Sequence, residues 1–342
     1  MTSPLRLRLD TAALIANWQW LAAQSGAAAC GAAIKADGYG LGAKQIVSRL
    51  ASVGCRDFFV ATWDEAEALG VLPEAATLSV LHGVRAEDMA VALASPARPV
   101  LNSVEQVQRW KSVGSLPCDV MIDTGMNRLG LAVEDVAAGL LTGLTIETLM
   151  SHLACADENH AMNASQLAAF AALKGKTSAK RMSLANSAGI CLGTDYAFDL
   201  TRPGLALYGG VPRAEAEGHI AQVAFPEAQV VQRRQVNAGE SIGYGATFVA
   251  PHDMAVAILN LGYADGYLRG FSGTGSAGDS RFPLLGRVSM DLIAVGVDAA
   301  PDVVEGDWVS LDFSLAAAAA QSGLAPYELL TGLGRRYARE WT

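Results

Sequence analysis

The amino-acid sequence predicts an α/β protein in two parts, a (β/α)8 barrel over residues 1–220 and a mostly antiparallel β domain over residues 221–342. Strand-like and helix-like segments alternate up to about residue 215, which is the pattern of a parallel barrel. Beyond about residue 220, short strands follow one another without helices and are separated by Gly, Pro and Asp. This change of pattern predicts the second, separate domain.

The first part opens with a helix over residues 10–26, for which Asp10 is the expected N-cap. Short apolar runs then predict eight strands, over residues 30–35, 57–61, 76–83, 98–102, 118–123, 145–152, 180–186 and 198–210. Two of the helices between them begin with capping boxes, Thr62 with Glu65 and Ser103 with Gln106. Eight strands alternating with helices predict a TIM-type barrel, which needs roughly 200–250 residues.

Six strand-like stretches make up the second part, over residues 224–236, 240–250, 253–263, 280–290, 292–298 and 307–313. A short helix within residues 325–341 is expected to close the chain. No internal repeat occurs, and no long linker separates the two parts.

The composition excludes several classes of protein. Of the 342 residues, 51% are apolar and only 17% are charged, so we expect a large core and no disorder. A net charge of −9 without a cluster of Lys and Arg argues against a nucleic-acid partner. No apolar stretch approaches the ~18 residues of a membrane span, and the N-terminus lacks the apolar core of a signal peptide. Five dispersed Cys residues predict free thiols in the cytoplasm.

Two patterns imitate functional motifs. Residues 273–278 read GTGSAG, but no clear strand precedes them and no helix follows, so we expect a flexible loop and not a nucleotide site. Residues 152–160 read HLACADENH, but their spacing is not that of a helical metal pair, and nothing supplies further ligands. The sequence therefore predicts no metal site.

Polar residues gather where the barrel strands end, which is where the chemistry of this fold takes place. Lys35 ends the first strand and is followed by Tyr39. The ends of later strands carry Asp123, Thr124, Arg128, His152, Asn186, Ser187 and Arg202. Because the strand bodies are apolar, we expect these side chains to share a pocket into which Lys35 points.

A lysine buried in such a pocket is commonly either an ion-pair partner or a nucleophile, since burial disfavours its charged form. If it bound the carbonyl of pyridoxal phosphate, the site would also need phosphate donors and a group facing the pyridine nitrogen. The Ser187 hydroxyl and the amides of Gly204 and Leu205 are available as phosphate donors. Arg202 is placed to face the ring nitrogen.

Eight motifs, in order over both parts, resemble alanine racemase, a family of fold-type III pyridoxal-phosphate enzymes. They are AAIKADGYGLGA (32–43), MIDTGMNRLGL (121–131), SHLACADEN (151–159), LANSAGI (184–190), TRPGLALYGG (201–210), SIGYGATF (241–248), LGYADGYLRG (261–270) and GRVSMDLIAVGV (286–297). The resemblance runs through nearly the whole chain. It implies a racemase that interconverts L- and D-alanine, either to supply D-alanine for cell-wall peptidoglycan or to serve alanine catabolism.

The resemblance also implies roles for the matching residues. Lys35 would bind the cofactor covalently, and Arg202 would hydrogen-bond its ring nitrogen. The remaining cofactor contacts would come from Tyr39, Asn186, Ser187, Gly204 and Leu205. Tyr244, reaching the site from the partner subunit of a homodimer, would be the second catalytic base, with His152 between it and Arg202. The substrate carboxylate would bind Arg128 and the Met290 amide, and the entrance would be lined by Tyr263 and Asp291.

Racemisation removes the α-proton on one face of the substrate and returns one on the other. One base on each face therefore suffices, an amine at Lys35 and a phenol at Tyr244. A free tyrosine, with a pKa of about 10, is a poor base at neutral pH. Tyr244 would need cationic neighbours, for which Arg128 and the Arg202–His152 pair are candidates.

The chain departs from the family pattern in two places. Many members have a lysine that is carbamylated and orients the substrate-binding arginine, but Met121 stands at that position here. Arg128 must then be oriented by a bound anion or by neighbouring side chains. Many members also have a further phosphate-binding tyrosine near the C-terminus, where this chain has Arg335, with Tyr337 two residues away. Which of these two contacts the phosphate stays open.

Three alternative functions are compatible with the same features. A decarboxylase of the same architecture would need a group that accepts a leaving carboxylate, and Tyr244 favours the racemase instead. The sequence does not exclude a racemase of another small amino acid, such as serine. A non-catalytic pyridoxal-phosphate carrier would be a single barrel, so the β domain argues against it.

Overall fold

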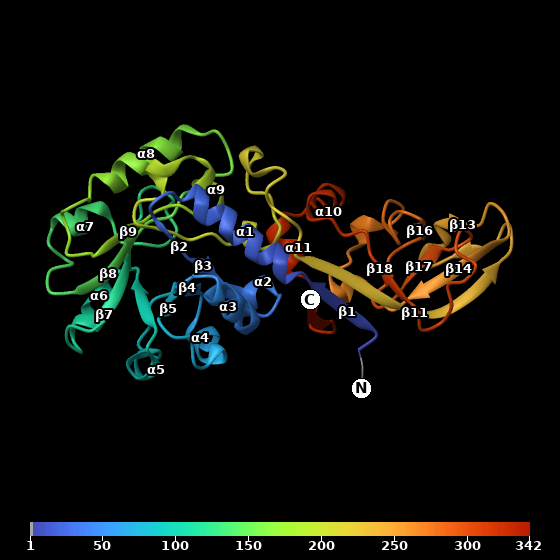
Figure 1. Ribbon diagram of the computed structural model, residues 1–342, viewed down its shortest axis with the longest axis horizontal. Coiled ribbons are helices and arrows are strands. Elements are labelled where there is room, and N and C mark those ends of the chain that lie inside the picture. Colours follow the sequence, from blue (N-terminus) through green and yellow to red (C-terminus); the bar gives the residue numbers. More distant parts are fainter. Residues whose placement is uncertain (1–2) are drawn as a thin grey trace. The chain divides into compact units, whose positions relative to one another are not determined.

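The computed structural model describes residues 3–342 and divides the chain into two compact units (Figure 1). One unit is Leu14–Ala221, and the other joins the residues up to Ala13 to Gln222–Thr342. The residues up to Ala13 were predicted to be part of the barrel, but they are not. They belong to the other unit because β1 (Leu5–Leu9) pairs antiparallel with the start of β11 (Ala224–Val236).

The Leu14–Ala221 unit is the expected parallel barrel. Seven of its strands form one parallel sheet in chain order: β3 (Ala32–Ala33), β4 (Asp57–Val60), β5 (Thr77–Val80), β6 (Arg98–Leu101), β7 (Pro117–Met121), β8 (Thr145–Met150) and β9 (Arg181–Ser183). β10 (Leu200–Thr201) pairs in parallel with β2 (Ala29–Cys30), which directly precedes β3. The Arg202 N–H also bonds the Ala185 carbonyl beside β9, at 2.9 Å. The last strand therefore closes the ring onto the first.

Helices connect successive strands and lie outside the ring (Figure 1). They are α1 (Thr11–Gln24), α2 (Lys35–Tyr39), α3 (Ala43–Ser52), α4 (Trp63–Leu69), α5 (Met89–Ala94), α6 (Val104–Lys111), α7 (Val133–Ala137), α8 (Ala161–Ala171) and α9 (Ser187–Cys191), with short 3-10 turns η1 (Thr194–Tyr196), η2 (Leu205–Tyr208) and η3 (Ala214–Ala216). No helix within residues 3–342 is long and apolar enough to cross a membrane.

Three expected N-caps are confirmed. The Asp10 carboxylate accepts the Ala13 N–H at 2.9 Å. The Thr62 hydroxyl accepts the Glu65 N–H, and the Ser103 hydroxyl accepts the Gln106 N–H, each at 3.3 Å. Each cap satisfies an N–H that the first helical turn leaves without a partner. The helix starts were therefore readable from local sequence.

The inside of the barrel is divided into an apolar layer and a polar layer. The apolar layer is a buried cluster of Phe59, Val100, Met121, Met150 and Leu200. The polar layer lies near the strand starts, where the Arg181 guanidinium donates to both Asp57 oxygens, at 2.6 and 3.1 Å. Buried Asp119 accepts from Ser79 at 2.6 Å and from Arg98 at 3.3 Å. Structural charges are thus paired at one end of the barrel, which leaves the carboxyl ends of the strands for function.

The second unit is built on one mostly antiparallel sheet in the order β15-β16-β17-β14-β11-β1-β19, with β18 paired to β11. Its strands besides β1 and β11 are β14 (Met254–Leu259), β15 (Ser276–Ala277), β16 (Phe282–Leu285), β17 (Ile293–Gly296), β18 (Trp308–Ser310) and β19 (Ala338–Trp341), and β12 (Ser241–Ile242) and β13 (Phe248–Val249) form a separate pair. The remaining elements are η4 (Tyr244–Ala246), η5 (Tyr263–Asp265), η6 (Arg269–Phe271), α10 (Leu315–Ser322) and α11 (Pro326–Thr331).

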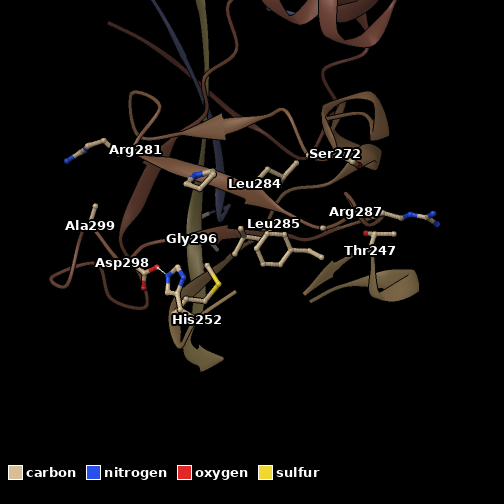
Figure 2. Close-up of a pocket in the computed structure, with 15 residues that line it drawn as sticks. Thr247, His252, Ser272, Arg281, Leu284, Leu285, Arg287, Gly296, Asp298 and Ala299 are labelled. Carbon is tan, nitrogen blue, oxygen red and sulfur yellow. Dashed lines mark ion pairs between the residues drawn. The ribbon is translucent and has the colours of Figure 1, made fainter. Parts of the chain in front are cut away.

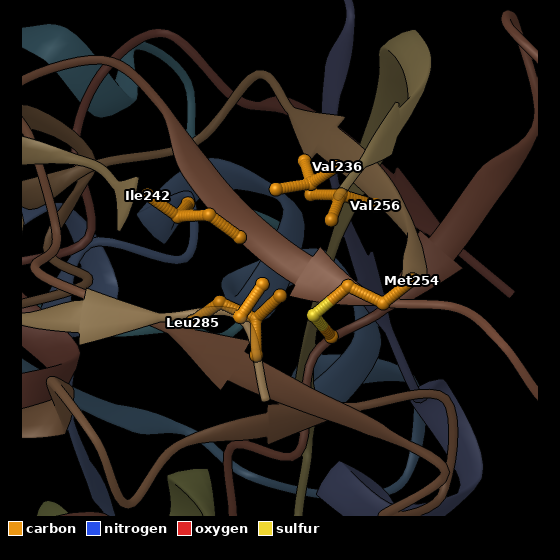
Figure 3. Packing of buried hydrophobic residues seen from close by; sticks show 6 residues of the cluster. Val236, Ile242, Met254, Val256 and Leu285 are labelled. Atoms are coloured by element: carbon orange, nitrogen blue, oxygen red, sulfur yellow. The ribbon is translucent and has the colours of Figure 1, made fainter. Parts of the chain in front are cut away.

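One core of this unit packs against the β11–β14 half of the sheet. Figure 3 shows Val236, Ile242, Met254, Val256 and Leu285 packed together, all of them buried. They come from four strands, and β14 is buried along almost its whole length, so this part of the sheet is covered on both faces. This packing supports the segment that follows β12, which begins with Gly243 and Tyr244.

The end of the chain differs from the expected helix. Helix α11 stops at Thr331, and after Gly332 and Gly334 the chain forms β19, which lies parallel to β1. Glycine is a weak helix former, so two glycines separated by a single residue end the helical pattern. The apolar residues beyond them serve a strand instead.

Candidate active site

The barrel brings four of the predicted polar residues to one mouth, at the carboxyl ends of its strands. Lys35 follows β3, Arg128 lies in the loop after β7, His152 follows β8, and Arg202 follows β10. Burial lowers the pKa of His152, and the charges of Arg202, Arg128 and Lys35 lower it further; desolvation and then the charge of Arg128 lower the pKa of Lys35. Charge effects of this kind act over short distances. The sequence prediction that these residues gather is consistent with this geometry.

Lys35 starts a turn of left-handed helix. Ala36 and Asp37 both have φ of 53°, and Tyr39 has φ of 57°. For residues that carry a Cβ, this conformation costs about 1–2 kcal/mol each. Such strain is kept where the surroundings enforce it, often at functional sites. The turn sets the direction in which Lys35 and Tyr39 leave the backbone.

Lys35 is exposed, whereas the sequence analysis expected it to be buried. The reason is that β3 ends at Ala33, so Lys35 lies on the rim of the barrel and not inside it. Partial desolvation at the rim nevertheless lowers the pKa of Lys35, the charge of Arg128 lowers it further, and Glu65 opposes both effects. Lowering the pKa increases the share of neutral amine, which is the nucleophilic form.

Backbone donors converge beside this turn. The amides of Gly204 and Ala206 both donate to the Ser187 hydroxyl, at 2.9 and 3.2 Å. Ser187 opens α9, whose N-cap Asn186 accepts the Gly189 N–H at 2.8 Å. Ala206 was not singled out from the sequence, which pointed to Leu205 instead. The donors form a small cradle at the start of α9 and η2.

Tyr39 closes one side of this cradle. Its ring is buried and lies 4.8 Å from the ring of Tyr208. A Cβ on Gly204 would lie only 2.3 Å from the Tyr39 hydroxyl oxygen, so only glycine fits there. Gly204 thus lets backbone N–H groups and a phenol meet at one point.

Arg202 is buried, with a relative exposure of 6%. Its guanidinium donates to the Ser183 hydroxyl and, at 2.6 Å, to the Ser151 carbonyl. Burial lowers the pKa of Arg202 to about 10, and the charge of Asp119 opposes this shift. Among residues 3–342, no carboxylate forms an ion pair with Arg202. A buried cation without an anionic partner is costly unless a ligand compensates it.

His152 is neutral in this setting. Burial and three nearby cations, Arg202, Arg128 and Lys35, lower its pKa to about 3. A neutral imidazole keeps one donor and one acceptor nitrogen, so it can link an arginine to a second polar group. This is compatible with the bridging role that the family resemblance implies.

Arg128 is exposed, and its loop is held by a carboxylate. Asp123 accepts the N–H groups of Gly125, at 2.8 Å, and of Arg128, at 3.1 Å. Met121 is buried in the apolar layer of the barrel, 7% exposed, which explains why it carries no polar function. The structure therefore shows a fixed loop backbone for Arg128, without a charged group at position 121.

These residues fit pyridoxal phosphate. The Ser187 hydroxyl oxygen accepts the Gly204 and Ala206 amides, and a hydroxyl keeps one hydrogen that it can donate to a phosphate oxygen at this helix start. The amine of Lys35 fits an aldehyde. The donor-only guanidinium of Arg202 fits a ring nitrogen that accepts. The barrel mouth thus offers a group for each end of that cofactor.

The second predicted base lies in the other unit. Tyr244 opens the 3-10 turn η4 between Gly243 and Gly245, which have φ of 77° and 73°. Tyr244 is 68% exposed and lines a cavity of about 730 Å³ together with Arg287. Tyr244 belongs to the second unit and is largely exposed, so its contacts within that unit do not indicate a role.

A further cavity of about 640 Å³ lies in the same unit (Figure 2). His252 and Asp298 face each other across 3.5 Å on its wall, and Arg281 lies at its edge. Arg287 lines this cavity as well. None of the predicted site residues lines it.

Three loops of the second unit meet around an arginine that sequence reasoning missed. The Arg336 guanidinium binds both oxygens of Asp265, each at 2.6 Å, and one oxygen of Asp291 at 2.7 Å. Asp265 is fully buried. Arg336 thus joins the turn that carries Met290 and Asp291 to the turn that begins at Tyr263.

Backbone hydrogen bonds also join the same loops. The Tyr263 N–H donates to the Ser289 carbonyl at 3.0 Å, and the Ala264 N–H donates to the Met290 carbonyl at 3.1 Å. Gly262 allows this approach, because a Cβ there would lie 2.2 Å from the Met290 carbonyl oxygen. The predicted entrance residues Tyr263 and Asp291 therefore belong to one ordered assembly with Met290.

Of the two candidates for the late phosphate contact, Tyr337 is buried within its own unit, 4% exposed, and Arg335 is exposed. Burial makes Tyr337 a core residue of this unit and raises its pKa. Arg335 is the residue that stays accessible to a ligand.

Comparisons with known proteins agree over both units. The model described as "Alanine racemase, N-terminal domain" matches residues 9–212, and "Alanine racemase, C-terminal domain" matches residues 223–341. The alanine racemase of Methylobacterium nodulans is 41% identical, over 98% of this chain and 95% of its own. A protein of Agrobacterium fabrum named "Alanine racemase, catabolic" is also 41% identical, over 98% of this chain and 91% of its own. The crystal structure of alanine racemase from Bartonella henselae with covalently bound pyridoxal phosphate has a TM-score of 0.90 and 34% identity, over 100% of both chains.

We expect His152 to make the free energy of unfolding depend on pH in the acidic range. Its folded-state pKa of about 3 lies below the ordinary value of about 6.5, so the unfolded chain alone gains a proton between these values. Stability is therefore lost as pH falls through that window. In His152→Gln, the free energy of unfolding should fall less steeply with decreasing pH, by up to about 1.4 kcal/mol per pH unit. Denaturant titrations of the cofactor-free chain measure both slopes, with His82→Gln as control. Parallel slopes for wild type and His152→Gln would contradict this assignment.

We expect Arg336 to stabilise the second unit. Arg336→Ala would leave the buried Asp265 carboxylate unpaired, and we expect a loss of about 1–3 kcal/mol, reduced by the partial exposure of Arg336. Arg336→Lys restores the charge without the two parallel hydrogen bonds and should lie between. Thermal and denaturant unfolding measure the loss. Arg335→Ala, which removes a neighbouring exposed arginine, should stay within about 0.5 kcal/mol of wild type, and an equal loss in both variants would argue against the clamp.

Proposed function

The chain belongs to the alanine racemase family, and from this premise we propose that it interconverts L- and D-alanine by a two-base mechanism, with Lys35 serving one face of the α-carbon and Tyr244 of a partner subunit the other. The observation that carries the proposal is the meeting of Lys35 with the phosphate-type cradle and with Arg202 at one barrel mouth. These groups come from both ends of the barrel sequence, from Lys35 to Ala206, and each suits a different part of pyridoxal phosphate. The family matches over both units support the same assignment.

When bound, pyridoxal phosphate draws electrons away from the α-carbon of an amino acid, so that the α-hydrogen becomes acidic. The protein then moves protons. Lys35 Nζ takes or returns a proton on one face, and Tyr244 Oη does the converse on the other. One turnover leaves each base in the protonation state that the other began with, and exchange with water restores both.

Arg202 tunes this chemistry through its hydrogen bond. A guanidinium only donates, so a ring nitrogen facing Arg202 accepts a hydrogen bond and stays unprotonated. The ring is then a weaker electron sink than one facing a carboxylate, which disfavours transamination. The charge of Arg202 acts on His152, whose imidazole is neutral. His152 would link Arg202 to Tyr244 by hydrogen bonds.

A dimer supplies the second base. Tyr244 is 68% exposed, and Met290 and Leu292 in the same unit are exposed at 53% and 40%. Exposed apolar residues beside a polar functional group are typical of a surface that a partner covers. A twofold dimer would give two equivalent sites, each with Lys35 from one chain and Tyr244 from the other.

Arg128 and the Met290 amide would hold the substrate carboxylate, the latter also from the partner. Arg128 supplies a guanidinium on a loop fixed by Asp123, and carboxylates suit such a group. Tyr263 and Asp291 would line the path to it. We place the enzyme in the cytoplasm, where its D-alanine would feed peptidoglycan or its activity would serve alanine catabolism.

We expect the purified protein to convert L-alanine to D-alanine and to approach a one-to-one mixture, since the two enantiomers have equal free energy. Chiral chromatography measures the product, and Lys35→Ala is expected to abolish it. Parallel incubations with L-serine and with basic amino acids test the alternatives. D-serine formed at the same kcat/KM would support a broader racemase, and carbon dioxide without D-alanine would show a decarboxylase.

Subunit mixing tests the shared site. Lys35→Ala and Tyr244→Ala homodimers should each be nearly inactive, and after dissociation, mixing and reassociation about half of the dimers would be mixed. Each mixed dimer rebuilds one intact site of two, so activity should return to roughly a quarter of wild type. Native mass spectrometry of the two tagged chains confirms exchange. If exchange occurs and no activity returns, Tyr244 does not act across subunits.

A further inference from the structure

The left-handed turn that begins at Lys35 is tied down by the carboxylate of Glu65, on α4. One oxygen of Glu65 accepts the N–H of Ala36 at 2.8 Å, and the other accepts the N–H of Ala61 at 2.7 Å. Ala36 is the residue directly after Lys35. Ala61 directly follows β4, the strand paired with β3. One side chain therefore fastens the Lys35 turn to the end of the neighbouring strand.

This tie acts at the most unfavourable part of the backbone. Ala36 is the first residue of the turn in the left-handed region, with φ 53° and ψ 46°. A residue with a Cβ does not hold this conformation without support. At the far end, the Asp37 carboxylate accepts the Ala43 N–H at 2.8 Å and so anchors the turn to α3. Glu65 supplies the corresponding anchor at the Lys35 end.

Helix capping does not account for the Glu65 side chain. In a capping box the glutamate would accept the N–H of the N-cap residue, Thr62. Here Thr62 caps the helix through its own hydroxyl, at 3.3 Å from the Glu65 nitrogen. The Glu65 carboxylate instead reaches past the cap to Ala61 and across to Ala36. Its charge also faces Lys35 and opposes the effect of Arg128.

We propose that Glu65 is a positioning residue of the active site: by bridging Ala36 and Ala61, it holds the left-handed turn in the form that aims the Lys35 amine and the Tyr39 hydroxyl at the cofactor. The inference rests on the proposed role of Lys35. It adds a specific cause for the direction of that side chain. Tyr39 is included because its hydroxyl lies against Gly204 in the cradle, at the other end of the same turn.

The test measures cofactor binding in three variants. Glu65→Ala removes both acceptors, and Glu65→Gln keeps one acceptor oxygen but turns an NH2 group towards an N–H donor. Glu67→Ala is the matched control, an exposed glutamate two residues along the same helix. Each full-length protein is stripped of cofactor, retitrated with pyridoxal phosphate by absorbance, reduced with borohydride and digested. Mass spectrometry then gives the fraction of Lys35 that carries the cofactor.

We expect Glu65→Ala to weaken pyridoxal-phosphate binding by about tenfold or more, the usual effect of losing a group that orients a ligand-binding residue. Labelling at Lys35 and kcat should fall together, with KM for alanine changed less than kcat. Glu65→Gln should lie between Glu65→Ala and wild type, and it keeps the test valid if Glu65→Ala does not fold. Glu67→Ala should bind pyridoxal phosphate like wild type.

A second substitution separates positioning from general stability. Glycine adopts the left-handed region without strain, so Ala36→Gly combined with Glu65→Ala should recover about fivefold in pyridoxal-phosphate affinity. If Glu65→Ala and Glu65→Gln lower the thermal unfolding temperature but bind pyridoxal phosphate within twofold of wild type, the inference is wrong. It is also wrong if Ala36→Gly gives no recovery. If borohydride labels another lysine in wild type, the Lys35 assignment itself fails, and this inference fails with it.

Discussion

The candidate site depends on closure of the barrel ring. The Gly31 N–H donates to the Thr201 carbonyl at 2.9 Å, and the Ala33 N–H donates to the Pro203 carbonyl at 2.8 Å, so the first strand is laced to the last. Gly31 permits this, because a Cβ there would lie 2.7 Å from the Asp57 carbonyl oxygen. Without this closure, Lys35 and the cradle around Gly204 would lie at opposite edges of an open sheet. The position of the Lys35 turn beside the cradle depends on these few backbone bonds.

The two ends of the barrel treat charge in opposite ways. Near the strand starts, each carboxylate meets an arginine, Asp57 with Arg181 and Asp119 with Arg98. At the mouth, Lys35, Arg128 and Arg202 have no ion-pair partner among residues 3–342, and burial together with these three charges lowers the pKa of the nearby His152. A concentration of unpaired positive charge is costly for the fold and favourable for a ligand with two anionic groups. Phosphate and a substrate carboxylate are such groups, and this accounts for the different solutions at the two ends.

The fold was predictable wherever local sequence sets local structure. Strand β11 covers the predicted residues 224–236, and the caps at Thr62 and Ser103 are in place. Lys35 and Arg202 could be found because functional residues of this barrel lie at the carboxyl ends of its strands.

The features that were not predicted depend on long-range pairing. Strand β1 has partners more than 200 residues away, in β11 and β19, so its sequence alone says nothing about its unit. Glu65 was recognised only as part of a capping box, since its bond to Ala36 spans 29 residues. Arg336 gave no signal, because its carboxylate partners lie 45 and 71 residues earlier.

The pairing of β1 with β11 and β19 has a consequence for synthesis on the ribosome. Strand β1 is made first, yet β11 begins at residue 224 and β19 at residue 338. At a usual rate of about 5–20 residues per second, the interval between β1 and β19 is on the order of half a minute. The residues of the Leu14–Ala221 unit are made before either partner of the strand Leu5–Leu9, and the edge that pairs with β19 waits longest. The alternating Leu and Arg of LRLRL put a charged side chain at every second position, and charged side chains on an open strand edge discourage pairing with foreign chains. The strand Leu5–Leu9 is thereby less prone to pair with foreign chains before β19 has been made.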